Sequence, residues 1–179
     1  MSKPDGPAKA IQTYRKEQVN AYDNTIRFTS KLLASVIEKL ESRCLRSAMI
    51  YTSDHGEDLF DDSRNLFLHA SPCPSYFQIH VPFLVWFSPQ LIEAYPNLMQ
   101  SALNNTGKVV ASSEAYFHTL MQLAGIESPK VNDVKSVVSP AYCSSSLNYL
   151  NDHNEKVSLR EAGLLDLDFV KLDSLLQCK

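Results

Sequence analysis

The longest regular pattern of apolar and polar positions lies near the N-terminus. Mostly apolar side chains recur there at alternating spacings of three and four residues, at Val19, Tyr22, Ile26, Thr29, Leu33, Val36 and Leu40. This spacing places them on one stripe of a helix, and neither glycine nor proline occurs between residues 11 and 43. The pattern predicts a helix over about residues 12–43 that packs against a sheet. A coiled-coil seam is disfavoured because the flanking positions are not regularly charged.

Two short apolar runs follow and predict strands. The run 47–53 stops abruptly at Asp54, His55 and Gly56, and a second apolar run spans residues 80–88. We expect both to be buried strands, and the first to be parallel because a helix precedes it. The residues between them, 54–74, are expected to form a loop.

Helical patterns return after the second strand. Residues 89–103 begin with Pro89, which suits the first turn of a helix, and residues 113–124 are followed by Gly125, a suitable C-cap. The order of helix, strand, loop, strand and helix favours the α/β fold class.

The two ends of the chain differ from this middle part. Residues 1–10 contain two prolines and a glycine and predict a loose lead-in. After Ile126 the chain becomes rich in Ser-Pro pairs, Asn and Asp, with Tyr142 and Tyr149 interspersed. These aromatic residues favour a C-terminal tail, residues 131–179, that packs on the domain.

Composition and charge exclude several classes of protein. The 179 residues are 44% hydrophobic and 21% charged, which suits one soluble globular domain. A net charge of −3 gives no basic stripe, so we expect no nucleic-acid partner. No apolar run reaches the length of a membrane helix, and the polar N-terminus does not resemble a signal peptide. The four cysteines form no Cys-x-x-Cys pair and favour thiols over a zinc ribbon.

The end of the first predicted strand carries the candidate chemistry. In α/β sheets ligands bind beyond the carboxyl ends of the strands, where Asp54 and His55 lie. A carboxylate and an imidazole suit Zn²⁺. Neighbouring strand residues point to opposite faces, so both reach one metal only if the chain turns sharply, which we expect Gly56 to permit. The loop could bring His69 back over the site, and Glu57 could orient a ligand.

Other interpretations of these residues stay open at this point. On residue types alone, Asp54 could equally cap backbone N–H groups in a turn at the strand end. A loop histidine such as His69 is often simply solvated. Glu57 and the acidic residues Asp58, Asp61 and Asp62 predict a solvated face of the loop. No nucleophile is evident, because there is no GxSxG elbow and no phosphate-cradling glycine loop.

Six segments follow one another along the chain in a specific order: Tyr22-Asp23-Asn24-Thr25-Ile26, then 51–57, Leu68-His69, 80–86, 117–120 and 123–126. In this order they resemble the lipid A phosphoethanolamine transferases of the sulfatase and alkaline phosphatase superfamily. The resemblance covers about residues 12–130, and its most specific part is Ser-Asp-His-Gly-Glu at 53–57.

The resemblance implies a fold, a cofactor and residue roles. Residues 11–130 would be the C-terminal part of an alkaline phosphatase-like catalytic domain, a three-layer α/β/α structure with a mainly parallel sheet. Asp54 and His55 match the family's zinc ligands, and His69 matches a histidine that contacts the transferred phosphoryl group or a second zinc. The family transfers phosphoethanolamine from a phospholipid donor to lipid A or a related glycan, in an inner-membrane protein whose domain faces the periplasm.

The sequence also departs from the family. Ala70 follows His69 where the family usually has glycine. The family's nucleophilic threonine, an acidic zinc ligand and a histidine precede the Tyr22 segment, so they are absent here. We therefore expect this chain alone to be inactive and to need the missing N-terminal half of the domain. A segment of a sulfatase-like or phosphodiesterase-like hydrolase, or a non-catalytic truncated remnant, remains an alternative.

Overall fold

The computed structural model describes residues 7–69, 73–143, 148–151, 153 and 155–176. Ala70 and residues 1–6 of the predicted lead-in lie outside them. Helix α1 (Pro7–Glu41) starts five residues earlier than expected. Its apolar stripe is only partly covered, because Tyr22 and Leu33 are half-buried whereas Ile26 is 50% exposed. Its strongest contact with another element is with β2, in a small hairpin.

The two predicted strands form one antiparallel pair. Strand β1 (Ala48–Thr52) lies beside β4 (Phe83–Phe87), with Met49 opposite Trp86. The prediction of a parallel first strand was therefore wrong for this pair, because the chain returns through a hairpin and a short helix and not through a crossover helix. The second strand is also shorter than predicted, since His80 ends helix α2 (Tyr76–Ile79).

The predicted loop 54–74 contains a second pair of strands. Strands β2 (Asp58–Leu59) and β3 (Phe67–Leu68) form an antiparallel hairpin in which Asp58 faces Leu68. Strands β5 (Asn148–Leu150) and β6 (Lys156–Ser158) form a third antiparallel pair. Within the residues that the structure describes, every strand pair is antiparallel, so the mainly parallel sheet is not seen there.

The remaining helices follow in chain order. They are α3 (Pro89–Ala94), α4 (Pro96–Asn104), α5 (Ser112–Leu123), the 3-10 turn η1 (Asp133–Lys135) and α6 (Asp166–Leu176). The helix predicted over residues 89–103 is divided in two, because Pro96 starts α4 as its first residue. In the described part of the chain, no helix has both the length and the apolar character of a membrane span.

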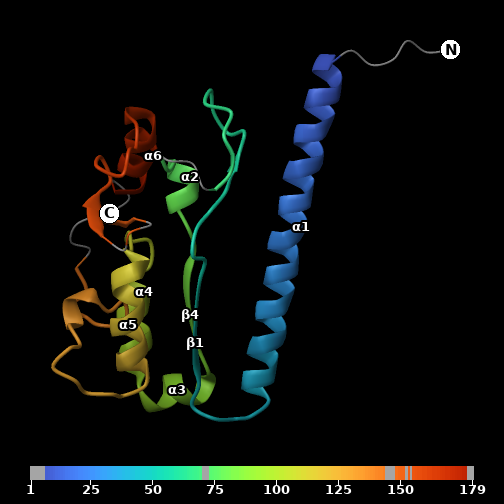
Figure 1. Cartoon of the computed structure of the whole chain (residues 1–179). Coiled ribbons are helices and arrows are strands. Elements are labelled where there is room, and N and C mark those ends of the chain that lie inside the picture. The colour runs from blue at the N-terminus through green and yellow to red at the C-terminus, as the bar shows by residue number, and fades with distance from the viewer. Residues whose placement is uncertain (1–6, 70–72, 144–147, 152, 154, 177–179) are drawn as a thin grey trace.

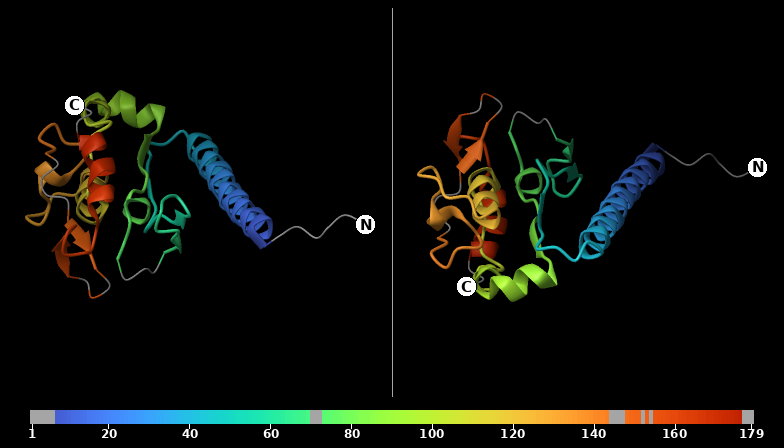
Figure 2. Two further views of the ribbon diagram at one scale, coloured as in Figure 1. Left: turned by 90° about the horizontal axis from the view of Figure 1, so that it is seen from above. Right: turned by 90° about the horizontal axis from the view of Figure 1, so that it is seen from below.

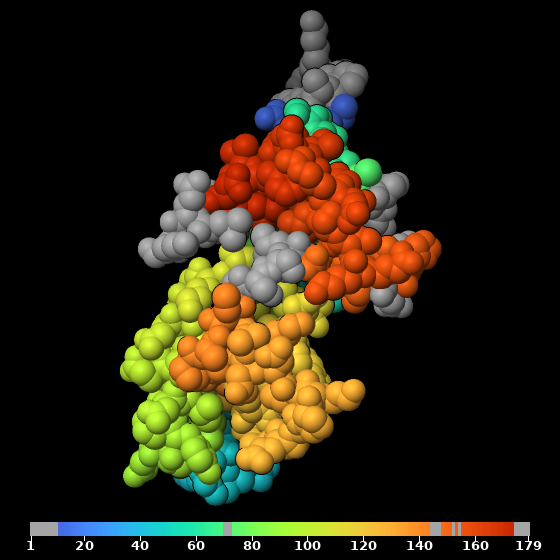
Figure 3. Space-filling model, turned by 90° about the vertical axis from the view of Figure 1, so that its left-hand side faces the viewer, coloured from blue at the N-terminus to red at the C-terminus, as the bar shows by residue number. Residues whose placement is uncertain are grey.

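The elements lie in layers around β1 and β4. Helices α4 and α5 cover one side of this strand pair and α1 stands on the other (Figures 1 and 2). The main core forms on the α5 side, where Ala115 packs with Val137, Val138 and Tyr142, all 7% exposed or less. Alternate side chains of β4, those of Phe83, Val85 and Phe87, pack against this cluster. Figure 3 shows the C-terminal segment, in orange and red, spread over this side of the molecule.

Asp168 in α6 ties the C-terminal segment to the rest of the fold. Its side chain is fully buried, and both carboxylate oxygens accept hydrogen bonds from the guanidinium of Arg64 at 2.8 Å. Burial raises the pKa of Asp168, but the hydrogen bonds from Arg64 and from the backbone N–H groups of Tyr76 and Leu165 outweigh it and hold this pKa below its usual range.

We expect the free energy of unfolding to decrease as the pH is lowered below about 4. In the unfolded chain Asp168 has its ordinary pKa of 3.8, and in the folded chain its pKa is lower. Such a group contributes stability that is complete above the unfolded value and is lost as the pH falls through the folded value. Urea unfolding at a series of pH values measures this loss, which should be shallower in Asp168→Asn. If the free energy of unfolding fell equally steeply with pH in the two proteins, Asp168 would not be the source of this pH dependence.

Candidate metal centre

Gly56 fixes the path of the chain as it leaves β1. Its backbone N–H donates to the carbonyl of Gln78 at 2.7 Å, and the residue is buried against α2. A Cβ atom at this position would lie 2.0 Å from the carbonyl oxygen of Phe77. Gly56 is not among the residues with positive φ, so the expected backbone freedom is not the reason for glycine here. Glycine is required because the chain passes so close to α2.

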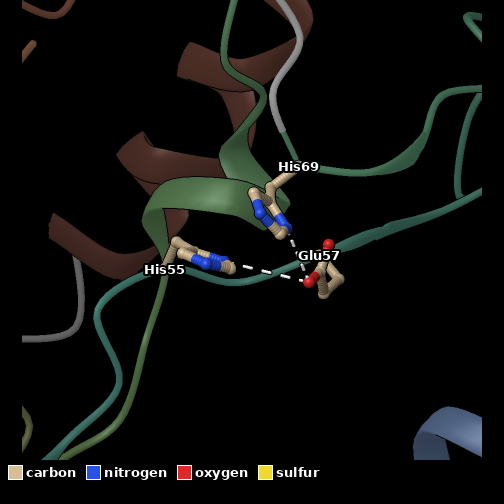
Figure 4. Close-up of side chains that lie close together, drawn as sticks. All are labelled: His55, Glu57 and His69. Atoms are coloured by element: carbon tan, nitrogen blue, oxygen red, sulfur yellow. Dashed lines mark hydrogen bonds and ion pairs between the residues drawn. The ribbon is translucent and has the colours of Figure 1, made fainter. Parts of the chain in front are cut away.

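Three of the predicted residues converge just beyond this point. Nδ1 of His69 lies 2.9 Å from Oε1 of Glu57, and Nδ1 of His55 lies 3.9 Å from the same oxygen (Figure 4). The two imidazole rings are 3.8 Å apart between centroids. One possible ligand atom from each residue lies within 4.8 Å of the other two, which is close enough for a shared cation.

The register of the β2–β3 hairpin explains why Glu57 and His69 meet. Asp58 faces Leu68 across the hairpin, so Glu57 and His69 flank this pair one residue further along each strand. Because neighbouring strand residues point to opposite faces, Glu57 turns toward the site while Asp58 turns away from it.

Asp58 is buried, and its prediction as part of a solvated face was wrong. It is 2% exposed, accepts a hydrogen bond from Ser75 Oγ at 2.6 Å, and accepts a second from the side-chain amide of Gln78. Asp62 pairs with Arg64, with 2.6 Å between the charged atoms. Of the four acidic residues in the predicted solvated face, Glu57 included, only Asp61 is exposed as predicted.

Asp54 lies beside the three converging residues but outside their group. Its side chain is 88% exposed, and its Oδ2 is 3.8 Å from Nε2 of His55. The backbone N–H of His55 donates to the Asp54 carboxylate at 3.1 Å and holds the pKa of that carboxyl below its usual range. The turn-capping interaction considered from the sequence is therefore present, and the same carboxylate is anionic and accessible to a cation.

Glu57 has an unsatisfied oxygen. Its side chain is 17% exposed, and its Oε2 is buried without a hydrogen-bond partner among the described residues. Leaving such an oxygen unpaired is unfavourable, and a nearby cation would compensate it. Helix α1 borders the site because it contacts β2, the strand that begins directly after Glu57. Burial, and after it the negative charge of Glu57, raises the pKa of Tyr22 in this helix. Two features of the sequence had singled out Tyr22: its place in the helical stripe and its place in the segment 22–26 that resembles the transferases.

The donor set fits Zn²⁺. Imidazole nitrogens and carboxylate oxygens are its usual ligands at open catalytic sites. A carboxylate bonded to the second nitrogen of a histidine is the common support for such a ligand, and Glu57 has this relation to His69. Two imidazoles and two carboxylates, from Asp54, His55, Glu57 and His69, are thus gathered at one edge of the molecule.

Comparison with known proteins places this chain in a family. A family model described as sulfatase matches residues 2–126, which is more than half of the chain. The chain belongs to the sulfatase family. Among curated proteins, phosphoethanolamine transferase EptA of Escherichia coli K12 is 32% identical over 131 residues, which are 69% of this chain and 23% of that protein. This sulfatase-family chain spans about a quarter of the length of that relative.

Solved structures agree. The soluble domain of lipooligosaccharide phosphoethanolamine transferase A from Neisseria meningitidis is 30% identical, with a TM-score of 0.62 over 72% of this chain and 39% of that one. The C-terminal periplasmic domain of EcEptC from Escherichia coli, in complex with Zn, gives a TM-score of 0.69 at 23% identity, over 88% of this chain and 42% of that one. The second likeness shows the fold alone. The resemblance to phosphoethanolamine transferases is confirmed, and the mixed α/β structure of this chain matches part of their alkaline phosphatase-like domains.

Proposed function

We propose that this chain is part of a zinc-dependent phosphoethanolamine transferase. In this proposal Asp54 and His55 bind Zn²⁺, His69 contacts the transferred phosphoryl group or a second zinc, and Glu57 orients His69. The observation that supports it most is the convergence of His55, Glu57 and His69 beyond β1, in a chain whose relatives include phosphoethanolamine transferases.

The distances in the site are compatible with these roles. Two ligands of a tetrahedral zinc, each about 2.0–2.2 Å from the metal, lie roughly 3.3–3.6 Å apart. Oδ2 of Asp54 and Nε2 of His55 are 3.8 Å apart, and the exposed Asp54 side chain can rotate to close the difference. Nδ1–H of His69 donates a hydrogen bond to Glu57, which leaves Nε2 as the atom that would contact phosphate or metal. Bound zinc would stabilise negative charge on the phosphoryl oxygens.

A second arrangement of ligands competes with this one. His55, Glu57 and His69 could all bind one metal directly, in which case the unpaired Oε2 of Glu57 would become a ligand atom. The two arrangements differ in whether Asp54 or Glu57 is the carboxylate ligand. The position of the bound metal therefore distinguishes them.

We further propose that the chain packs against the N-terminal half of the same domain. Its accessible surface is 12205 Å², whereas a compact monomer of 20.1 kDa exposes about 8,700 Å². Large apolar side chains contribute to the excess, among them Phe28 at 69% and Leu32 at 52% on α1 and Leu84 at 41% on β4. In the whole domain these strands would join a larger, mainly parallel sheet between helices. On this proposal the N-terminal half of the domain supplies the nucleophilic threonine.

The whole protein, on this proposal, resides in the inner membrane with the domain in the periplasm. It takes phosphoethanolamine from a phospholipid and transfers it to lipid A or a related glycan. We expect these 179 residues by themselves to bind metal without completing the transfer.

Binding of O-phosphoethanolamine to the zinc-loaded chain tests the function. We expect calorimetry to detect zinc-dependent binding, and His69→Gln to weaken it about 10–100-fold, because one hydrogen bond to a charged group is lost. His153→Gln serves as the control, since His153 is an exposed histidine outside the site. Binding that does not depend on zinc would contradict the proposal. Tighter binding of an aryl sulfate would favour the sulfatase-like alternative.

A further inference from the structure

The carboxylate of Asp168 is the most completely bonded polar group of the C-terminal segment. Its Oδ1 accepts from Arg64 Nη2 and from the backbone N–H of Tyr76, both at 2.8 Å. Its Oδ2 accepts from Arg64 Nη1 at 2.8 Å and from the backbone N–H of Leu165 at 3.0 Å. These four donors fill the acceptor capacity of an ionised carboxylate. The Asp168 side chain is fully buried, so none of these bonds competes with bulk water.

Arg64 links Asp168 to the β2–β3 hairpin, which is flanked by the site residues Glu57 and His69. It lies between β2 and β3, and its guanidinium also donates to Asp62, from Nε at 3.1 Å and from Nη2 at 2.6 Å. The guanidinium of Arg64 is therefore hydrogen-bonded to both Asp62 and Asp168, and the Arg64 side chain is only 16% exposed. Glu57 and His69 stand at the base of the same hairpin, immediately before β2 and after β3.

Tyr76 links Asp168 to helix α2, the second element that supports the site. It is the first residue of α2, and the carbonyl of Gln78 in the same helix accepts the hydrogen bond from Gly56. Asp168 therefore bonds both to the hairpin that presents Glu57 and His69 and to the helix against which the chain after His55 is packed. It is 104 residues away from Arg64 in the sequence.

We infer that Asp168 is a positioning residue for the metal centre: its buried carboxylate, through Arg64 and the N-terminus of α2, holds Glu57 and His69 opposite His55. The inference rests on the proposed zinc site. On this inference the C-terminal segment helps to position the metal-site residues. Asp168 itself forms no hydrogen bond with any of them in the described part of the chain.

Titration of the full chain with Co²⁺, a spectroscopic probe for a zinc site, tests the inference. We expect Asp168→Asn to weaken Co²⁺ binding by about tenfold or more and to change the visible absorption of bound Co²⁺, as loss of outer support does at metal sites. Asp166→Asn is the matched control, because this carboxylate lies two residues away on the same helix and is 92% exposed. It should leave both affinity and spectrum unchanged.

A purely structural role predicts a different result. In that case Asp168→Asn would lower the melting temperature while the folded variant bound Co²⁺ with unchanged affinity and spectrum, and this result would overturn the inference. If Asp168→Asn does not fold, Arg64→Lys replaces it, because lysine keeps the charge but lacks the two-pronged geometry. Its unchanged affinity would be equally decisive. Absence of Co²⁺ binding in the unsubstituted chain would instead overturn the proposed function, and with it this inference.

Discussion

Replacement of Gly56 by alanine is expected to destabilise the chain by about 2–4 kcal/mol and to weaken metal binding. The added Cβ would lie 2.0 Å from a backbone oxygen of α2, so one of the two segments must move. Overpacking of this kind costs about 1–3 kcal/mol, and loss of the bond from Gly56 to Gln78 adds about 1 kcal/mol. For a chain of this size the melting temperature should fall by roughly 5–15 °C, measured by thermal unfolding.

The control for this substitution is Gly107→Ala. Gly107 has a φ of 82°, so alanine there is strained, but no atom lies within 4 Å of its added Cβ. We expect a loss of about 1–2 kcal/mol and no change in metal affinity. A Gly56→Ala variant with the stability and metal affinity of the unsubstituted chain would show that the contact with α2 does not fix the site.

Joint replacement of Asp54 and His55 by alanine is expected to remove zinc binding. Both proposed ligands on this chain are lost, so zinc content after equilibrium dialysis should fall to about 1% of the unsubstituted value or less at the same free zinc concentration. The fold should be retained, because both side chains are accessible, at 88% and 38% exposure. Asp166→Ala with His153→Ala is the control. Equal zinc content in the Asp54 and His55 variant and the unsubstituted chain would exclude the assignment.

The position of the candidate site could be predicted from the sequence alone, but the way its residues converge could not. Asp54 and His55 were found because an apolar run stops at them, which is a local signal. The convergence of Glu57 and His69 depends on the hairpin register, in which Asp58 faces Leu68, and two-residue strands are too short to show a pattern of their own. The antiparallel pairing of β1 and β4 was missed because pairing direction depends on the path between the strands.

Buried polar contacts were the least predictable part. Asp58 looks like a loop acid, yet it is buried because Ser75 and Gln78, far along the chain, donate to it. Arg64 and Asp168 are 104 residues apart, and no spacing rule connects them. Gly56 was expected to serve a turn, whereas its importance lies in the nearness of Phe77. The resemblance to phosphoethanolamine transferases succeeded because residues 53–57 form a specific segment.

Zinc anomalous diffraction from crystals of the zinc-loaded chain tests the central claim most directly. We expect a peak about 2.0–2.2 Å from the His55 imidazole and from the Asp54 carboxylate, with Glu57 bonded to His69 and not to the metal. A peak bonded to Glu57 in place of Asp54, or no peak at His55, would contradict it.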